Sequence, residues 1–320
     1  MRAMSKSRIL SWLLAAVLVA MAAPAHADES GAHYKQGLAL KSQGKNDEAI
    51  AAFEKAVAAN PKHGMAWGSL GHLYKQRKEI DKAVAAYEHA TETITKDAIL
   101  WSSLGMAYYR ANRVDDAAAA LEKSIAINPK DAETLANLGV IRRQKGELPL
   151  AIKHLEAAVK LAPNDSGYQN NLGVAYRTAN RIDDALKAFY KAVGLAPADA
   201  QIRFNLAVVY RRQSDIDKAI PTYEKVVELE PSFSEAWYDL GFMYKLNHDD
   251  AKAVEAFNRY LELEKGKDPE AQKRIEAEIS ALGGTATTTK KDDKAGKGKS
   301  SKAGKGGGKG TGDGKGKGKN

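Results

Sequence analysis

Apolar positions along most of this chain follow a helical period and recur in blocks of equal length. Between residues 30 and 267, apolar side chains return at intervals of three and four residues, which places them on one side of an α-helix. The arrangement repeats every 34 residues, so that Trp67 to Trp101 is one interval and Trp101 to Trp237 is four. The pattern predicts an all-α chain of helical hairpins that cover one another's apolar stripes by stacking.

Small and large residues occupy fixed places in each block. Gly or Ala lets two helices approach closely, a bulky residue fills the remaining space, and Pro cannot continue a helix. The first half of a block carries a Leu-Gly or Leu-Ala pair: Leu70-Gly71, Leu104-Gly105, Leu138-Gly139, Leu172-Gly173, Leu206-Ala207 and Leu240-Gly241. The second half opens with Ala49, Ala83, Ala117, Ala151, Ala185, Ala219 or Ala253, and the bulky residue follows four positions later.

These positions resemble the tetratricopeptide-repeat consensus, Trp-x2-Leu-Gly-x2-Tyr followed by Ala-x3-Phe-x2-Ala and a closing Pro. The resemblance implies a right-handed superhelical α-solenoid of seven helix-turn-helix repeats. Their expected bounds are 30–63, 64–97, 98–131, 132–165, 166–199, 200–233 and 234–267. Asp268 and Pro269 then predict the start of a capping helix over 268–284. Arg142 stands where the consensus has an aromatic residue.

The formal charge of +9 belongs to the two ends of the chain. Residues 1–27 carry +3 and residues 285–320 carry +8, from eleven Lys and three Asp, so residues 28–284 carry 9 − 3 − 8 = −2. The tail has no aromatic or branched aliphatic residue, which predicts a disordered Lys/Gly-rich segment. Without aromatic side chains to stack on bases, nucleic acid is not the expected partner.

Residues 1–27 predict a signal peptide. Basic residues precede the apolar run 9–23, and Ala25-His26-Ala27 offers a cleavage site. The alternative is a transmembrane anchor, but the run is shorter than the roughly 20 residues that span a bilayer. We therefore expect an exported protein, periplasmic or secreted, with no transmembrane anchor after cleavage.

The sequence offers no pattern for catalysis. It contains no cysteine, and no two histidines after residue 27 are spaced as a metal-binding pair on one helix. The acidic pairs Asp115-Asp116, Asp183-Asp184 and Asp249-Asp250 fall at expected helix starts, where carboxylates cap the helix and favour its dipole. We expect no enzyme, no metal site and no cofactor.

Two rows of polar residues mark the candidate binding groove. In tetratricopeptide arrays the first helix of each hairpin lines a concave face that takes an extended peptide. Just before the Leu-Gly pairs stand Asn137, Asn171 and Asn205, which resemble the asparagine ladder of the O-linked N-acetylglucosamine transferase repeats. Six residues further on, the chain has Lys75, Tyr109, Arg143, Arg177, Arg211 and Lys245, with Lys41 in the first block. Together with Arg110, Arg142 and Arg212 beside them, these residues make a basic stripe.

An amide side chain can donate to a peptide carbonyl and accept from an N–H, and guanidinium groups pair with carboxylates. The two rows therefore predict a groove for an extended or acidic peptide segment. The alternative is that they are consensus residues and a solvated row of charges.

Together these features predict a non-enzymatic scaffold or adaptor that serves protein partners in a bacterial envelope or secretion assembly. The alternative function is binding to a polyanion or an anionic surface through the basic tail, with the repeats as a spacer.

Overall fold

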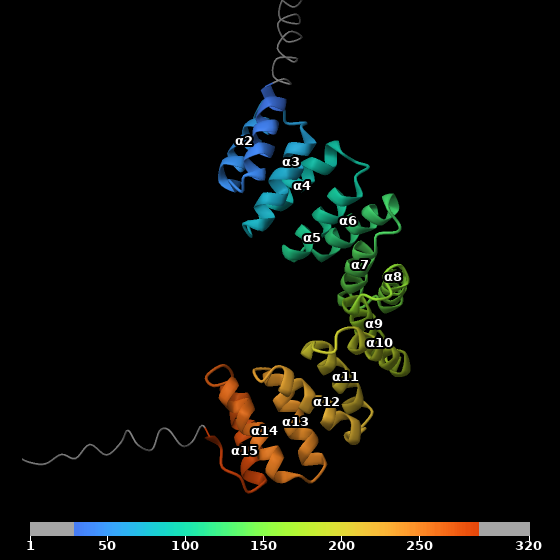
Figure 1. The fold of residues 1–320 in the computed structure, drawn as a ribbon, viewed down its shortest axis with the longest axis vertical. Helices are drawn as coiled ribbons and strands as arrows, with labels where there is room; N and C mark the ends of the chain where they lie inside the picture. Colours follow the sequence, from blue (N-terminus) through green and yellow to red (C-terminus); the bar gives the residue numbers. More distant parts are fainter. Residues whose placement is uncertain (1–28, 288–320) are drawn as a thin grey trace, which may run out of the picture. The chain divides into compact units, whose positions relative to one another are not determined.

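The structure is a computed structural model that describes residues 29–287. Residues 1–28, which contain the expected signal peptide, and residues 288–320, which contain most of the expected disordered tail, lie outside the described residues. Between 29 and 287 the chain forms helices joined by short turns and contains no strand. The predicted fold class is therefore confirmed: an all-α array of helical hairpins closed by one further helix (Figure 1).

The hairpins follow one another in chain order. Residues 29–42 form the first helix, and α2 (Asn46–Ala59) completes the first pair. The next five pairs are α3 (Gly64–Gln76) with α4 (Ile80–Thr93), α5 (Ala98–Arg110) with α6 (Val114–Ile127), α7 (Ala132–Gln144) with α8 (Leu148–Leu161), α9 (Ser166–Thr178) with α10 (Ile182–Leu195), and α11 (Ala200–Arg212) with α12 (Ile216–Leu229). The last elements are α13 (Ser234–Leu246) with α14 (Asp250–Leu263), and α15 (Pro269–Ala281).

The chain divides into two compact units, Met1–Leu229 and Glu230–Asn320. The described part of the first unit contains six hairpins, and that of the second contains the hairpin α13–α14 followed by α15. Within residues 29–287, no helix is both long enough and apolar enough to cross a membrane.

The glycine of each Leu-Gly pair lies against the bulky residue of the same hairpin. A Cβ atom added to Gly71 would lie 2.7 Å from a ring carbon of Tyr87, and one added to Gly139 would lie 2.6 Å from Leu155. The same close approach joins Gly37 to Phe53, Gly105 to Leu121, Gly173 to Phe189, and Gly241 to Phe257. The block pattern therefore has a direct physical cause, because any side chain at these glycines would push the two helices apart.

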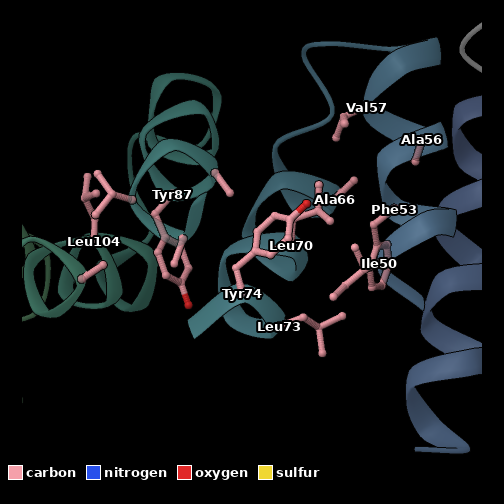
Figure 2. Close-up of a cluster of buried hydrophobic side chains, with 14 of the residues drawn as sticks. Ile50, Phe53, Ala56, Val57, Ala66, Leu70, Leu73, Tyr74, Tyr87 and Leu104 are labelled. Atoms are coloured by element: carbon pink, nitrogen blue, oxygen red, sulfur yellow. The ribbon is translucent and has the colours of Figure 1, made fainter. Parts of the chain in front are cut away.

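The alanines that open the second helices are fully buried in all seven hairpins. Ala49 and Ala83 belong to a core in which Phe53, Leu70, Tyr87 and Leu104 follow one another through successive hairpins (Figure 2). Because each hairpin contributes apolar residues to the core of the next, no hairpin buries its own stripe alone.

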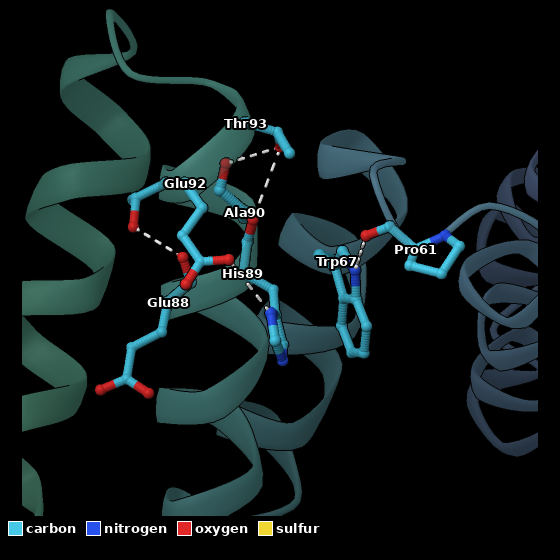
Figure 3. A network of polar contacts seen from close by, with 8 residues as sticks. Pro61, Trp67, Glu88, His89, Ala90, Glu92 and Thr93 are labelled. Carbon is cyan, nitrogen blue, oxygen red and sulfur yellow. Dashed lines mark hydrogen bonds and ion pairs between the residues drawn. The ribbon is translucent and has the colours of Figure 1, made fainter. Parts of the chain in front are cut away.

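The tryptophans that recur with the 34-residue period form hydrogen bonds to the loops between hairpins. The indole N–H of Trp67 donates to the carbonyl of Pro61 at 2.9 Å, and its ring lies 4.6 Å from that of His89 (Figure 3). Trp101 bonds Thr95 and Trp237 bonds Pro231 in the same way. In two of the blocks without this tryptophan, Gln169 and Arg203 donate to the carbonyls of Pro163 and Pro197.

Every turn inside a hairpin contains one residue with positive φ, again at intervals of 34. Glycine fills the position at Gly44 and Gly146, which is the residue best suited to a left-handed backbone. The other five turns place Lys78, Asn112, Asn180, Ser214 and His248 there, with φ between 57° and 62°. Asn tolerates a left-handed backbone, whereas Lys78, Ser214 and His248 carry backbone strain at this position.

The chain after α15 folds back on the second unit. The side-chain amide of Asn258 donates to the carbonyl of Thr285 at 3.1 Å and accepts from the N–H of Thr287 at 2.8 Å. Ala286 between them is buried. Residues 285–287, which are the first three residues of the expected tail, are thus held on α14.

Candidate functional site

Successive hairpins of the first unit are joined along a seam of polar contacts. We call hairpin seam the contacts between the second helix of one hairpin and the first helix of the next. A tyrosine on the first helix bonds a glutamate twenty residues earlier: Tyr74 with Glu54 at 2.6 Å, Tyr108 with Glu88 at 2.7 Å, and Tyr176 with Glu156 at 2.6 Å. Burial, and next the bond to glutamate, raises the pKa of Tyr108 and of Tyr176 to about 12, so these hydroxyls stay protonated as donors.

Arg142 occupies the tyrosine position of the fourth hairpin and takes over its role. Its guanidinium bonds Glu122, the glutamate twenty residues earlier, and also Glu147 on the adjoining turn. Hydrogen bonds from Arg142 hold the pKa of Glu147 below its ordinary value. The expectation that Arg142 adds to the basic stripe is wrong, because its side chain is only 14% exposed and its charge is already paired.

The arginines of the predicted stripe meet on a different surface, the first-helix face. We give this name to the surface formed in the first unit by residues 29–42, α3, α5, α7, α9 and α11. There α9 packs directly against both α7 and α11, so that equivalent positions of successive first helices lie close together. The structure thereby brings Arg143, Arg177, Arg211 and Arg212 into one arginine cluster.

Arg177 is the centre of the arginine cluster. Its side chain is half-buried, and burial together with the charges of Arg212 and Arg143 lowers its pKa. Arg212 also donates to the backbone carbonyl of Arg177 at 3.1 Å. Among residues 29–287, no carboxylate lies within ion-pair distance of Arg143 or Arg177. The cluster therefore holds like charges close together and partly out of water, and neither Arg143 nor Arg177 has a countercharge among residues 29–287.

The three asparagines of the predicted ladder differ in environment. Asn137 on α7 and Asn171 on α9 are half-buried on the face that carries the arginine cluster. Asn205 on α11 is buried, and its amide donates to the side-chain oxygen of Asn170 at 2.9 Å. Asn205 therefore takes part in packing between α9 and α11, whereas Asn137 and Asn171 are partly exposed.

The two lysines at the ends of the predicted stripe also differ. Lys75 on α3 is half-buried. Burial is the largest cause that lowers the pKa of the His72 imidazole, and the nearby charges of Lys41 and Lys75 lower it further. Lys245 belongs to the second unit, where its ammonium group pairs with Glu278 of α15. The charge of Lys245 is thus used to hold the capping helix.

The acidic pairs lie at the starts of α6, α10 and α14, where they favour the helix dipole as expected, but most of them do not cap the helix. Only Asp249 does so, accepting from the N–H of Lys252 at 3.3 Å. Asp116 and Asp184 lie in first turns and pair instead with Arg113 and Arg181, each at 2.7 Å. The carboxylates that cap α5, α7, α9 and α11 recur at 34-residue intervals, at Asp97, Asp131, Asp165 and Asp199, and the acidic pairs gave no sign of them.

The described residues contain no group of three or more His, Asp or Glu side chains arranged to hold a metal ion. The chemistry that the first-helix face can perform is recognition. Guanidinium groups donate to carboxylates or phosphates, and the amides of Asn137 and Asn171 can bond a peptide backbone.

Comparison with known families matches two models to this chain. The model of the Cilia and flagella-associated protein 70 C-terminal domain matches residues 12–235, and a tetratricopeptide-repeat model matches residues 204–271. A search of curated proteins finds no match.

Several solved structures share the fold. The C-terminal part of a repeat protein from Cytophaga hutchinsonii is 21% identical with a TM-score of 0.60, over 74% of this chain and 97% of its own. YrrB, described as having an unusual peptide-binding site, is 23% identical with a TM-score of 0.52, over 59% of this chain and 97% of its own. MamA from Desulfovibrio magneticus is 26% identical with a TM-score of 0.50, over 53% of this chain and 97% of its own.

Proposed function

This chain belongs to the tetratricopeptide-repeat family, and we propose that it is a non-enzymatic scaffold whose first-helix face binds an extended, carboxylate-bearing segment of a partner protein. The observation that carries the proposal is the arginine cluster. Arg143 and Arg177 have no carboxylate partner among residues 29–287, and burial together with the like charges of Arg212 and Arg143 lowers the pKa of the half-buried Arg177. A bound carboxylate would supply the missing countercharge in bidentate geometry.

Asn137 and Asn171 support an extended conformation for the bound segment. Each amide can bond one carbonyl and one N–H of a peptide without reading its side chains. The second unit contains a working example of this chemistry, because Asn258 grips the backbone at Thr285 and Thr287 through both of its amide atoms. A ligand held in this way is fixed by its backbone and selected by its charge.

A titration with synthetic peptides tests the proposal. The probe is a fluorescein-labelled peptide of Glu, Gly and Ser, compared with the same peptide carrying Lys in place of Glu. We expect only the acidic peptide to bind, and the double variant Arg143→Glu, Arg177→Glu to lose at least about tenfold in affinity.

The basic tail will also attract an acidic peptide, so the control must keep it. The double variant Lys153→Glu, Lys187→Glu makes the same change in net charge on the second helices α8 and α10. If both double variants bind equally well, the arginine cluster is not the site.

We further propose that the scaffold works outside the cytoplasm, as an adaptor in a bacterial envelope or secretion assembly. The support is the order of basic, apolar and small residues before Asp28, which is typical of a signal peptide. Cell fractionation and N-terminal sequencing of the mature protein test this. A chain that starts at Met1 in the cytoplasmic fraction would exclude it.

A second candidate function rests on charge distribution. Residues 285–320 carry +8, whereas residues 28–284 carry −2. A polycation of this kind binds anionic lipid surfaces with about 1 kcal/mol per Lys near the surface, and salt screens the attraction. Binding of the full chain and of a chain ending at residue 287 to anionic vesicles across a salt series separates this function from peptide binding.

A further inference from the structure

A pocket of about 220 Å³ opens on the first-helix face, away from the arginine cluster. It lies where residues 29–42, α3 and α5 adjoin, and its apolar wall includes Met65, Ile99 and Leu100. Met65 is 53% exposed and Ile99 is 75% exposed, so two large apolar side chains face solvent beside one pocket. Exposed apolar residues gathered at a concave site are typical of a binding surface.

The rim of the pocket is basic. Lys41 and His72 line it, and Lys75 is a close neighbour of His72. Among residues 29–287, neither Lys41 nor Lys75 has a carboxylate within ion-pair distance. The one carboxylate in the lining, Asp97, is occupied as the cap of α5, where it accepts from Ile99 and Leu100 at 2.8 and 3.1 Å. The pocket thus joins an apolar wall to uncompensated positive charge.

We propose that this pocket takes a large aliphatic side chain of the same partner segment, next to a carboxylate that pairs with Lys41 or Lys75. The inference rests on the proposed function, because the segment continues along the face to the arginine cluster. It adds specificity to that function: the partner is an acidic segment with an aliphatic anchor rather than any polyanion.

The spacing of the first helices fixes where the anchor lies in the partner. The pocket lies between α3 and α5, and the arginine cluster centres on α9, about two and a half helices further along. First helices packed 8–10 Å apart put the two sites about 20–25 Å apart. An extended chain of about 3.3 Å per residue crosses that distance in about six to eight residues.

The test uses the full chain and two labelled peptides of equal charge. One has the sequence Glu-Leu, a spacer of seven Gly and Ser residues, and three Glu; the other has Ser in place of Leu. Both sequence orders are made, because the direction of the bound chain is open. The Lys-rich tail attracts both peptides equally, so the ratio of their affinities reports the pocket alone.

We expect the Leu peptide to bind about five- to tenfold more tightly than the Ser peptide, as for partial burial of one aliphatic side chain. The variants Ile99→Ser and Met65→Ser should each bring this ratio close to one. Because both residues are largely exposed, the helical content should not change. Leu150→Ser, which removes an exposed leucine from α8, should keep the preference.

Two results separate the failure of this inference from that of the proposed function. If both peptides bind equally and the Arg143→Glu, Arg177→Glu variant abolishes binding, the pocket takes no anchor although the arginine cluster is a site. A Leu preference that survives both Ile99→Ser and Met65→Ser also overturns the inference. If neither peptide responds to the charge-reversal variant, the proposed function itself fails.

Discussion

Arg142 and Arg143 are consecutive residues of α7, yet they lie in two different electrostatic settings. Arg142 points into the hairpin seam, where Glu122 and Glu147 neutralise it. Arg143 lies on the first-helix face beside Arg177, and no carboxylate among residues 29–287 pairs with it. Among residues 29–287, the charge of Arg142 is paired with carboxylates and the charge of Arg143 is not. The difference indicates that charge at the seam serves stability, whereas charge on the face is available to a partner.

The largest expected loss of stability comes from the packing beneath both regions. Ala151 is fully buried, and its carbonyl lies 3.1 Å from the place that a Cβ of Gly139 would occupy. Ala151→Leu should overpack this contact and cost roughly 1–3 kcal/mol, seen as a lower thermal midpoint. Lys153→Leu, at an exposed position of the same helix, is the control and should change stability by less than about 0.5 kcal/mol.

A smaller loss is expected from opening the seam. Arg142→Met removes the bonds to Glu122 and Glu147 while keeping an apolar stem, and should cost about 1–2 kcal/mol in urea unfolding. Arg142→Tyr restores the residue found at Tyr108 and Tyr176, and its hydroxyl can bond Glu122. We expect that variant to be within about 0.5 kcal/mol of the unmodified chain. Equal losses for both variants would mean that the seam does not depend on this bond.

The turn that follows each stripe residue allows a stabilising change. Lys78 has φ of 62°, in a position that Gly146 fills in the fourth hairpin. Lys78→Gly should raise the free energy of unfolding by about 0.5–1 kcal/mol because it relieves the left-handed backbone, and Gly146→Ala should lower it by a similar amount. Neither change touches the first-helix face, so peptide affinity should stay the same.

The smallest expected effect is a dependence on pH. Burial, followed by the charges of Arg142 and Lys153, lowers the pKa of His154 at the seam. Below pH 6.5 the unfolded chain therefore binds this proton more readily than the folded chain, and stability falls as the pH drops. Between pH 7.0 and 5.5 we expect His154→Gln to lose less stability than the unmodified chain, by about 0.5 kcal/mol or less. Identical losses would place the sensitive group elsewhere.

The fold was predictable because one packing requirement recurs every 34 residues. Gly71, Gly105 and Gly139 each contact a bulky residue sixteen positions later. The spacing in the sequence therefore identifies which residues meet between the two helices of a hairpin. The convergence of Arg143 and Arg177 was predictable for the same reason, since equivalent positions of stacked first helices are neighbours. The division into two compact units at Leu229 and Glu230 was not predictable, because the 34-residue period continues across that boundary.

The parts of the site that were missed depend on contacts that sequence spacing does not show. Arg142 and Lys245 look like stripe residues, but Glu122 lies 20 residues before the first and Glu278 lies 33 residues after the second. Asn205 looks like Asn137 and Asn171 until its bond to Asn170 is seen. The apolar pocket was missed because Met65 and Ile99 occupy a position where the repeat sets no preference.

The central claim is that Arg142 stabilises the fold whereas its neighbour Arg143 binds the partner. The pair of variants Arg142→Gln and Arg143→Gln tests this claim most directly. Each change removes one positive charge and leaves the tail intact, so the attraction of the whole chain for an acidic peptide is matched. Arg143→Gln should weaken binding of the Glu-containing peptide by about tenfold with an unchanged thermal midpoint. Arg142→Gln should lower the midpoint and leave the affinity unchanged. If the two variants bind the peptide equally well, the first-helix face is not the binding surface and the account is wrong.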